Sequence, residues 1–92
     1  MTLLELKRRL RDGAYAWPGG YPLFFITSDG AALCFACVRK EWRNVVQDWI
    51  WAARRRYRGS GWLVEACDVN WEDPDLHCDH CSAQIESAYA DD

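Results

Sequence analysis

Two short motifs with the same spacing carry the metal-binding potential of this sequence. Cys34-Phe35-Ala36-Cys37 lies near the middle of the chain, and Cys78-Asp79-His80-Cys81 lies near its end. The two-residue spacing sets the bite of each cysteine pair, and two such pairs supply the four thiolates that a structural zinc ion prefers. The sequence therefore predicts one zinc ion bound by Cys34, Cys37, Cys78 and Cys81.

Four thiolates fill the coordination shell of zinc and leave no open position for water or substrate, so we interpret this zinc as structural. His77 and His80 flank the second motif, and one of them could replace a cysteine; with four suitably spaced thiols, we treat both as surface or supporting residues. Cys67 has no C-x-x-C partner. We read it as a small buried side chain, and a fifth or alternate ligand or a reactive thiol is the alternative.

The acidic stretch 68–73 spaces oxygen atoms as a calcium-binding loop begins. Asp73 stands at the sixth position, where such a loop requires glycine, and Asp79 stands where the bidentate Glu would be. We therefore read the stretch as a turn with a solvated acidic surface. No nucleophile or activating base is placed beside these carboxylates, so we predict that the protein is not an enzyme and infer no small-molecule substrate.

The length and composition indicate one small globular unit. The chain has 92 residues, which allows a single domain over residues 1–92. Its modest core needs additional stabilisation, which a bound metal ion can supply. Half of the residues are hydrophobic and six are Trp, as in ordered proteins. No apolar stretch approaches the roughly 20 residues of a membrane span, and no signal-peptide pattern is present. Five cysteines with two C-x-x-C motifs favour metal ligands over disulfides, so we expect a cytoplasmic protein that does not contact membranes.

Charge is divided sharply along the chain. Residues 1–60 carry all eleven Lys and Arg against five acids, a net charge of +6, whereas residues 61–92 carry nine acids and no base, a net charge of −9. The two motifs lie on opposite sides of this division, so the halves must pack together. We expect internal ion pairs to cancel part of the asymmetry, each contributing about 0–1 kcal/mol where exposed.

Periodicity and turn signals indicate the elements that position the first motif. Thr2 and Glu5 form a capping-box pattern at the start of a short amphipathic helix over residues 3–12. The apolar runs 23–27 and 31–35 flank a turn signal and predict a β-hairpin. The first cysteine motif thus begins at the end of a hairpin, as it does in zinc ribbons.

The remaining elements complete an α+β fold. Apolar residues at helical spacing predict one long helix from Val38 to about Arg58. Loose alternation over residues 62–71 predicts a strand buried on both faces, and residues 85–89 could add a last short strand. We expect a small antiparallel sheet with this long helix packed on it, the short N-terminal helix, and a zinc-ribbon-like four-cysteine site.

The outer face of the long helix is a candidate partner-binding surface. Trp51 projects away from the apolar stripe and falls among polar and basic residues, which are Gln47, Arg54, Arg55 and Arg58. A Trp among arginines can stack on a base or fill a pocket on an acidic partner. The alternative is that Trp51 packs under the acidic C-terminal segment, with the arginines paired to its carboxylates.

Two long segments resemble a group of small bacteriophage and prophage zinc-knuckle proteins of unassigned function. The resemblance covers about residues 20–90 and rests on these runs: Gly20-Tyr21-Pro22, Asp29-Gly30, Cys34-Phe35-Ala36-Cys37, Asp68-Val69-Asn70-Trp71-Glu72-Asp73-Pro74-Asp75-Leu76, Cys78-Asp79-His80-Cys81 and Ile85-Glu86-Ser87-Ala88-Tyr89. It implies a phage genome and expression in a bacterial cytoplasm, and it carries no activity.

The sequence favours a non-enzymatic interaction module. The leading hypothesis is a phage accessory protein that binds a host or phage protein, for example as an inhibitor of a host defence complex. The alternative is a nucleic-acid-binding zinc-ribbon module that uses the basic helix.

Overall fold

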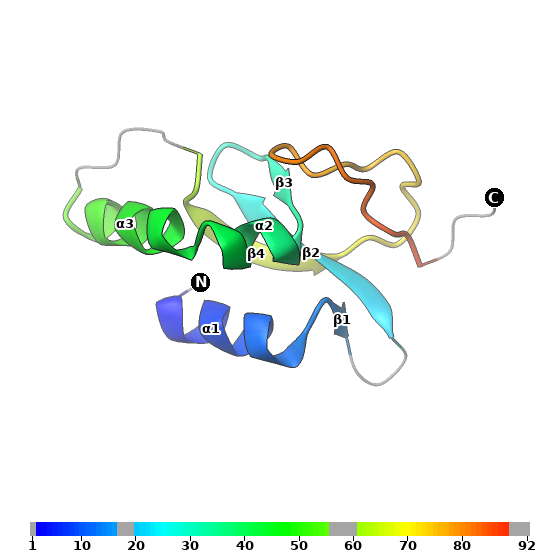
Figure 1. The fold of residues 1–92 in the computed structure, drawn as a ribbon, viewed down its shortest axis with the longest axis horizontal. Helices are drawn as coiled ribbons and strands as arrows, with labels where there is room; N and C mark the ends of the chain where they lie inside the picture. The colour runs from blue at the N-terminus through cyan, green and yellow to red at the C-terminus, as the bar shows by residue number, and fades with distance from the viewer. Residues whose placement is uncertain (1, 17–19, 56–60, 89–92) are drawn as a thin grey trace.

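In the part of the chain that the structure describes, the fold is a small antiparallel sheet with three helices (Figure 1). The computed structural model describes residues 2–16, 20–55 and 61–88. In chain order the elements are α1 (Leu3–Asp12), β1 (Tyr15–Ala16), β2 (Tyr21–Thr27), β3 (Ala32–Leu33), α2 (Phe35–Lys40), α3 (Trp42–Ala53) and β4 (Val64–Val69). The predicted α+β class is confirmed.

Strand β2 is the centre of the sheet, and all three other strands pair with it antiparallel. Strand β4 runs along most of its length, from Leu23 opposite Val69 to Thr27 opposite Val64. Strands β1 and β3 pair with the two ends of β2. The amides of Leu23 and Thr27 bond to the β1 and β3 sides, so both short strands share the edge opposite β4.

The predicted hairpin is present as β2, a turn and β3. The Thr27 amide donates to the Ala31 carbonyl at 2.9 Å, and the Ala31 amide donates to the buried Thr27 hydroxyl at 3.1 Å. Gly30 has a φ of 81° in this turn, a conformation that glycine adopts without steric cost. The return strand is shorter than expected, because the chain turns into α2 at Phe35.

The long helix of the prediction is two helices. Helix α2 begins at Phe35, inside the first cysteine motif, and α3 ends at Ala53 rather than near residue 58. Glu41 separates them with φ −102° and ψ 28°, and its amide still bonds to the Cys37 carbonyl at 2.9 Å. Only part of the apolar stripe faces the core: Val38 and Val45 are buried, whereas Ile50 and Ala53 near the end of α3 are exposed.

The core forms where the helices meet β2. Phe25 is fully buried and stacks on Phe35 with ring centroids 4.2 Å apart. Leu6 of α1 belongs to the same apolar cluster as Val38 and Val45. One core therefore joins all three helices to the sheet.

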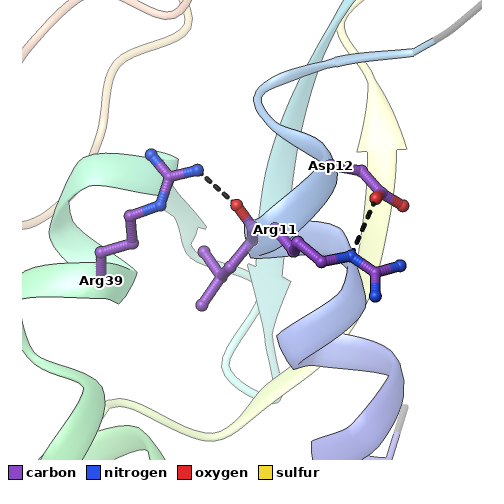
Figure 2. A network of polar contacts seen from close by, with 4 residues as sticks. Arg11, Asp12 and Arg39 are labelled. Carbon is purple, nitrogen blue, oxygen red and sulfur yellow. Dashed lines mark hydrogen bonds and ion pairs between the residues drawn. The ribbon is translucent and has the colours of Figure 1, made fainter.

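Helix α1 forms as the capping box predicts and lies against α2. The Glu5 amide donates to the Thr2 hydroxyl at 3.2 Å, which satisfies one of the free amides of the first turn. At the other end, the Arg39 guanidinium donates to the Leu10 carbonyl oxygen (Figure 2). A cation at a helix C-terminus is favourable because the last carbonyls carry partial negative charge.

Asn70 fixes the segment that follows β4. Its side chain is buried, and Nδ2 donates to the carbonyl oxygens of Asp73, Ile85 and Glu86 at 2.9, 3.2 and 3.1 Å. Its Oδ1 accepts from the Asp73 amide at 3.2 Å, and its own carbonyl accepts from the Ala88 amide. One side chain thus ties the acidic turn to the C-terminal segment. Residues 85–88 form no strand; the predicted residue 89 lies outside the described residues.

Candidate metal centre

The four cysteines of the two motifs converge. All four Sγ atoms of Cys34, Cys37, Cys78 and Cys81 lie within 4.8 Å of one another. The Cys34 and Cys81 sulfurs are 3.8 Å apart, and the Cys37 and Cys78 sulfurs are 3.7 Å apart. A tetrahedron with metal–sulfur bonds of about 2.3 Å has edges of about 3.8 Å. The two cross-motif separations match this geometry and are far longer than the ~2.05 Å of a disulfide bond.

The first motif gets its geometry from the junction of β3 and α2. Cys34 is the N-cap residue of α2, directly after Leu33 of β3, and Cys37 lies in the first turn of the helix. The Val38 amide donates to the Cys34 carbonyl at 3.2 Å. A helix start inside the motif therefore holds its two sulfurs on the same side.

The second motif is a tight turn docked on the hairpin. The Ser82 amide donates to the Cys78 carbonyl at 2.8 Å, and the Cys78 amide donates to the Ala83 carbonyl at 2.9 Å. Ser82 has a φ of 63°, which closes the turn in a left-handed conformation. The Asp79 amide donates to the Ala32 carbonyl at 2.9 Å. This bond places the second motif beside β3 and therefore beside Cys34.

Burial raises the pKa of the cysteine thiols, whereas hydrogen bonds from backbone amides lower it. Burial raises the pKa of the Cys37 thiol well above its usual range, and the other three cysteine side chains raise it further. Burial also raises the pKa of Cys78, but the backbone amides of Cys81, Cys34 and His80 outweigh it and lower the value to about 7. Amides that point at a sulfur stabilise the thiolate, the form that binds metal.

The donor set fits a tetrahedrally coordinated metal ion. Four thiolates this close repel one another and require a cation to be charged together. A divalent ion with four thiolates leaves a centre of net charge −2. Two sulfurs are buried, those of Cys37 and Cys78, whereas Cys81 is exposed. The centre is therefore shielded from solvent on the side of Cys37 and Cys78 and exposed to solvent at Cys81.

The histidines and the fifth cysteine lie outside this cluster. No histidine belongs to the metal-binding group found among residues 2–16, 20–55 and 61–88. The His80 ring contacts Trp62, with centroids 4.9 Å apart, and His77 Nδ1 lies 2.5 Å from the Asp75 carbonyl oxygen. Cys67 is half-buried on β4 opposite Phe25, and burial raises its pKa. The four-cysteine ligand set needs none of these side chains.

The predicted partner-binding residues are only partly placed on one helix. Gln47 is exposed on α3, and Trp51 is half-buried. Arg54 and Arg55 are exposed but follow the end of α3, and Arg55 has a φ of 57°. Arg58 lies outside the described residues. The prediction places all of these residues on one helix, but α3 ends at Ala53, before the first of the arginines.

The expected ion pairs between the basic and acidic parts are not formed among the described residues. There the structure contains one ion pair, between Arg11 and the neighbouring Asp12 at 3.3 Å (Figure 2). Both side chains are mostly exposed, so this pair contributes about 0–1 kcal/mol.

The comparisons with known proteins leave the site to be judged by its own geometry. No family profile, curated protein or solved structure matches this chain. Among the described residues, no helix is both long and apolar enough to cross a membrane.

Sequence reasoning did not find the role of Asn70 or the neighbours of the second motif. The sequence predicts Asn70 only as part of an acidic turn, and no local pattern links it to Ile85 or Glu86. Trp62 was read as a strand residue, although its ring meets His80 beside the metal centre. These contacts join residues far apart in the chain, and periodicity carries no signal for them.

Proposed function

We propose that this chain is a non-enzymatic interaction module closed by one structural zinc ion. The observation that carries the proposal is the pair of cross-motif sulfur separations, 3.7 and 3.8 Å, which suit a tetrahedral four-thiolate site. Zinc is the metal most typical of such a ligand set. A full thiolate shell supports a structural role because it leaves no position for a substrate.

The proposed partner is a protein, contacted through a surface at the C-terminal end of α3 that we call the α3 surface. Its predicted residues are Gln47 and Trp51 of the helix and the arginines that follow it, Arg54, Arg55 and Arg58. Exposed arginines beside a half-buried Trp are typical of binding surfaces. The resemblance to phage proteins adds the proposal of a phage accessory role in a bacterial cytoplasm, for example inhibition of a host defence complex. Nucleic acid is the competing partner, and it is supported by the lack of an ion pair to Arg54 or Arg55 within the described residues.

Metal analysis tests the structural part of this proposal. Freshly purified protein should contain one zinc ion per chain, and a strong chelator should remove the zinc and unfold the protein, because a small domain loses its stability margin with its metal. Replacing zinc by cobalt(II) should give the absorption of a tetrahedral thiolate complex. Zinc-free protein with a disulfide between Cys34 and Cys37 would contradict the proposal.

Binding assays separate the two kinds of partner. Capture from an infected bacterial lysate should recover a protein whose binding weakens by about 2 kcal/mol or more on Trp51→Ala. Binding to random oligonucleotides with a steep salt dependence, reduced by about one unit of slope in Arg55→Ala, would favour nucleic acid instead.

A further inference from the structure

A small pocket lies beside the metal centre. It has a volume of about 260 Å³, opens to solvent, and is lined by Ala31, Leu33, Gly61, Trp62, Asp79 and His80. Typical small-molecule sites have volumes of roughly 300–1,000 Å³. The pocket is therefore better matched to one side chain of a partner than to a whole ligand of that size.

Two walls of the pocket are fixed by hydrogen bonds to the fold. The Trp62 amide donates to the buried Asp48 carboxylate at 2.9 Å, and the Trp62 ring meets the His80 ring with centroids 4.9 Å apart. The Asp79 amide is bound to the Ala32 carbonyl of β3. A binding site whose backbone is already ordered loses less conformational entropy when it binds.

The chemistry of the walls selects a cation. Trp62 offers an indole ring, and Asp79 offers an exposed carboxylate. The adjacent four-thiolate centre carries a net charge of −2 with a divalent metal. Residues 61–92 contain nine acids and no base, and Asp79 forms no ion pair within the described part of the chain. Asp79 and the thiolate centre would therefore both contribute negative charge at the pocket.

A guanidinium satisfies both walls better than an ammonium. Its planar group stacks on an aromatic ring, with favourable cation–π contacts within about 6 Å of the ring centroid, and it pairs with a carboxylate through two parallel hydrogen bonds. Lysine is a point charge that lacks the second property. The apolar floor of Ala31 and Leu33 suits the methylene stem of the same side chain.

We propose that this pocket binds an arginine side chain of a protein partner, stacked against Trp62 and paired with Asp79. The inference rests on the proposed function, because it assumes a protein partner and a metal that holds the second motif beside β3. It adds a contact point formed by residues other than those of the α3 surface.

Nuclear magnetic resonance titration of the zinc-loaded chain tests the proposal. The probes are three blocked pentapeptides with arginine, citrulline or lysine between glycines; citrulline keeps the shape of arginine without its charge. The arginine peptide should shift the Trp62 indole and the Asp79 amide signals saturably, with an affinity at least about tenfold above the citrulline peptide. Asp79→Asn should weaken it about fivefold or more. Asp75→Asn, an equal charge change in the same segment, should alter it less than about twofold.

Several results would overturn the assignment. These are the absence of a saturable shift at Trp62, equal affinity for the citrulline or lysine peptide, and equal losses in the two Asp variants, which would indicate diffuse attraction. The zinc content and the dispersion of the resonances, measured on the same sample, distinguish failure of the arginine pocket from failure of the proposed zinc-stabilised module. Folded protein with one zinc and no arginine binding rejects only the pocket, whereas zinc-free folded protein rejects the proposed function.

Discussion

Replacing Asn70 by alanine tests whether one buried amide holds the acidic turn to the C-terminal segment. The change removes the contacts of Nδ2 with three carbonyl oxygens, which share its two hydrogens, and one hydrogen bond accepted from the Asp73 amide. Each such bond contributes about 0.5–1.5 kcal/mol net. Water can reach the partly buried carbonyls of Asp73 and Glu86, whereas the bond to the Ile85 carbonyl is buried. We therefore expect the free energy of unfolding to fall by about 2–4 kcal/mol.

The measurement is urea unfolding followed by circular dichroism at a fixed concentration of free zinc, because bound metal adds to apparent stability. Asn44→Ala is the matched control: Asn44 is exposed on α3 and bonds only locally, to Glu41 at 2.8 Å. It should cost less than about 0.5 kcal/mol.

A second substitution separates hydrogen bonding from packing. Asn70→Asp keeps the shape and the acceptor for the Asp73 amide but cannot donate to the three carbonyls, so at pH 7 it should destabilise at least as much as Asn70→Ala. Two results would show that Asn70 does not hold the two segments together. One is a free energy of unfolding for Asn70→Asp equal to that of the unaltered protein, and the other is an equal value for Asn70→Ala and Asn44→Ala.

Three further predictions follow from single sites. Serine at Cys34, Cys37, Cys78 or Cys81 should abolish zinc binding and unfold the chain, as followed by metal analysis and thermal melting. Cys67→Ser should keep the zinc and lower the free energy of unfolding by about 1–3 kcal/mol. Loss of zinc and of folding in all five variants would indicate that Cys67 is a ligand. Arg55→Gly should stabilise by roughly 1 kcal/mol because it relieves the left-handed φ of 57°. Arg54→Gly, at φ −93°, should destabilise by up to about 1 kcal/mol, and similar melting of both variants would exclude strain at Arg55. Phe25→Ala should lower the free energy of unfolding in urea by about 3–5 kcal/mol. Phe24 is half-buried on the other face of β2, so Phe24→Ala should lower it clearly less. An equal loss in the two variants would show that the core is not centred on Phe25.

The parts of the fold that rest on neighbouring residues could be predicted from the sequence. The hairpin follows from a glycine turn between two apolar runs, and helix α1 follows from its capping box. The four-cysteine cluster follows from the spacing within each motif, since two residues between cysteines fix the bite whatever lies between the motifs.

The break at Glu41 and the early end of α3 were not predictable in this way. Apolar spacing continues smoothly across residue 41, so periodicity gives one helix. The chain instead starts α2 at Phe35, directly after Cys34, and Glu41 separates α2 from α3 with non-helical dihedral angles. The end at Ala53 depends on a left-handed Arg55, which no propensity scale favours.

The convergence of the four cysteines, the class of fold and the division of charge could all be predicted from the amino-acid sequence, because each depends on residue type and local spacing. The contacts of Asn70 with three carbonyl oxygens from two segments, and the position of Trp62 and Asp79 in the walls of one pocket, depend on the tertiary structure. These features join residues that are distant in the sequence: Asn70 and Glu86 are 16 positions apart, and Trp62 and Asp79 are 17 positions apart. Their geometry is set by how β4 and the second motif dock on β2 and β3, and local sequence preferences do not encode that docking.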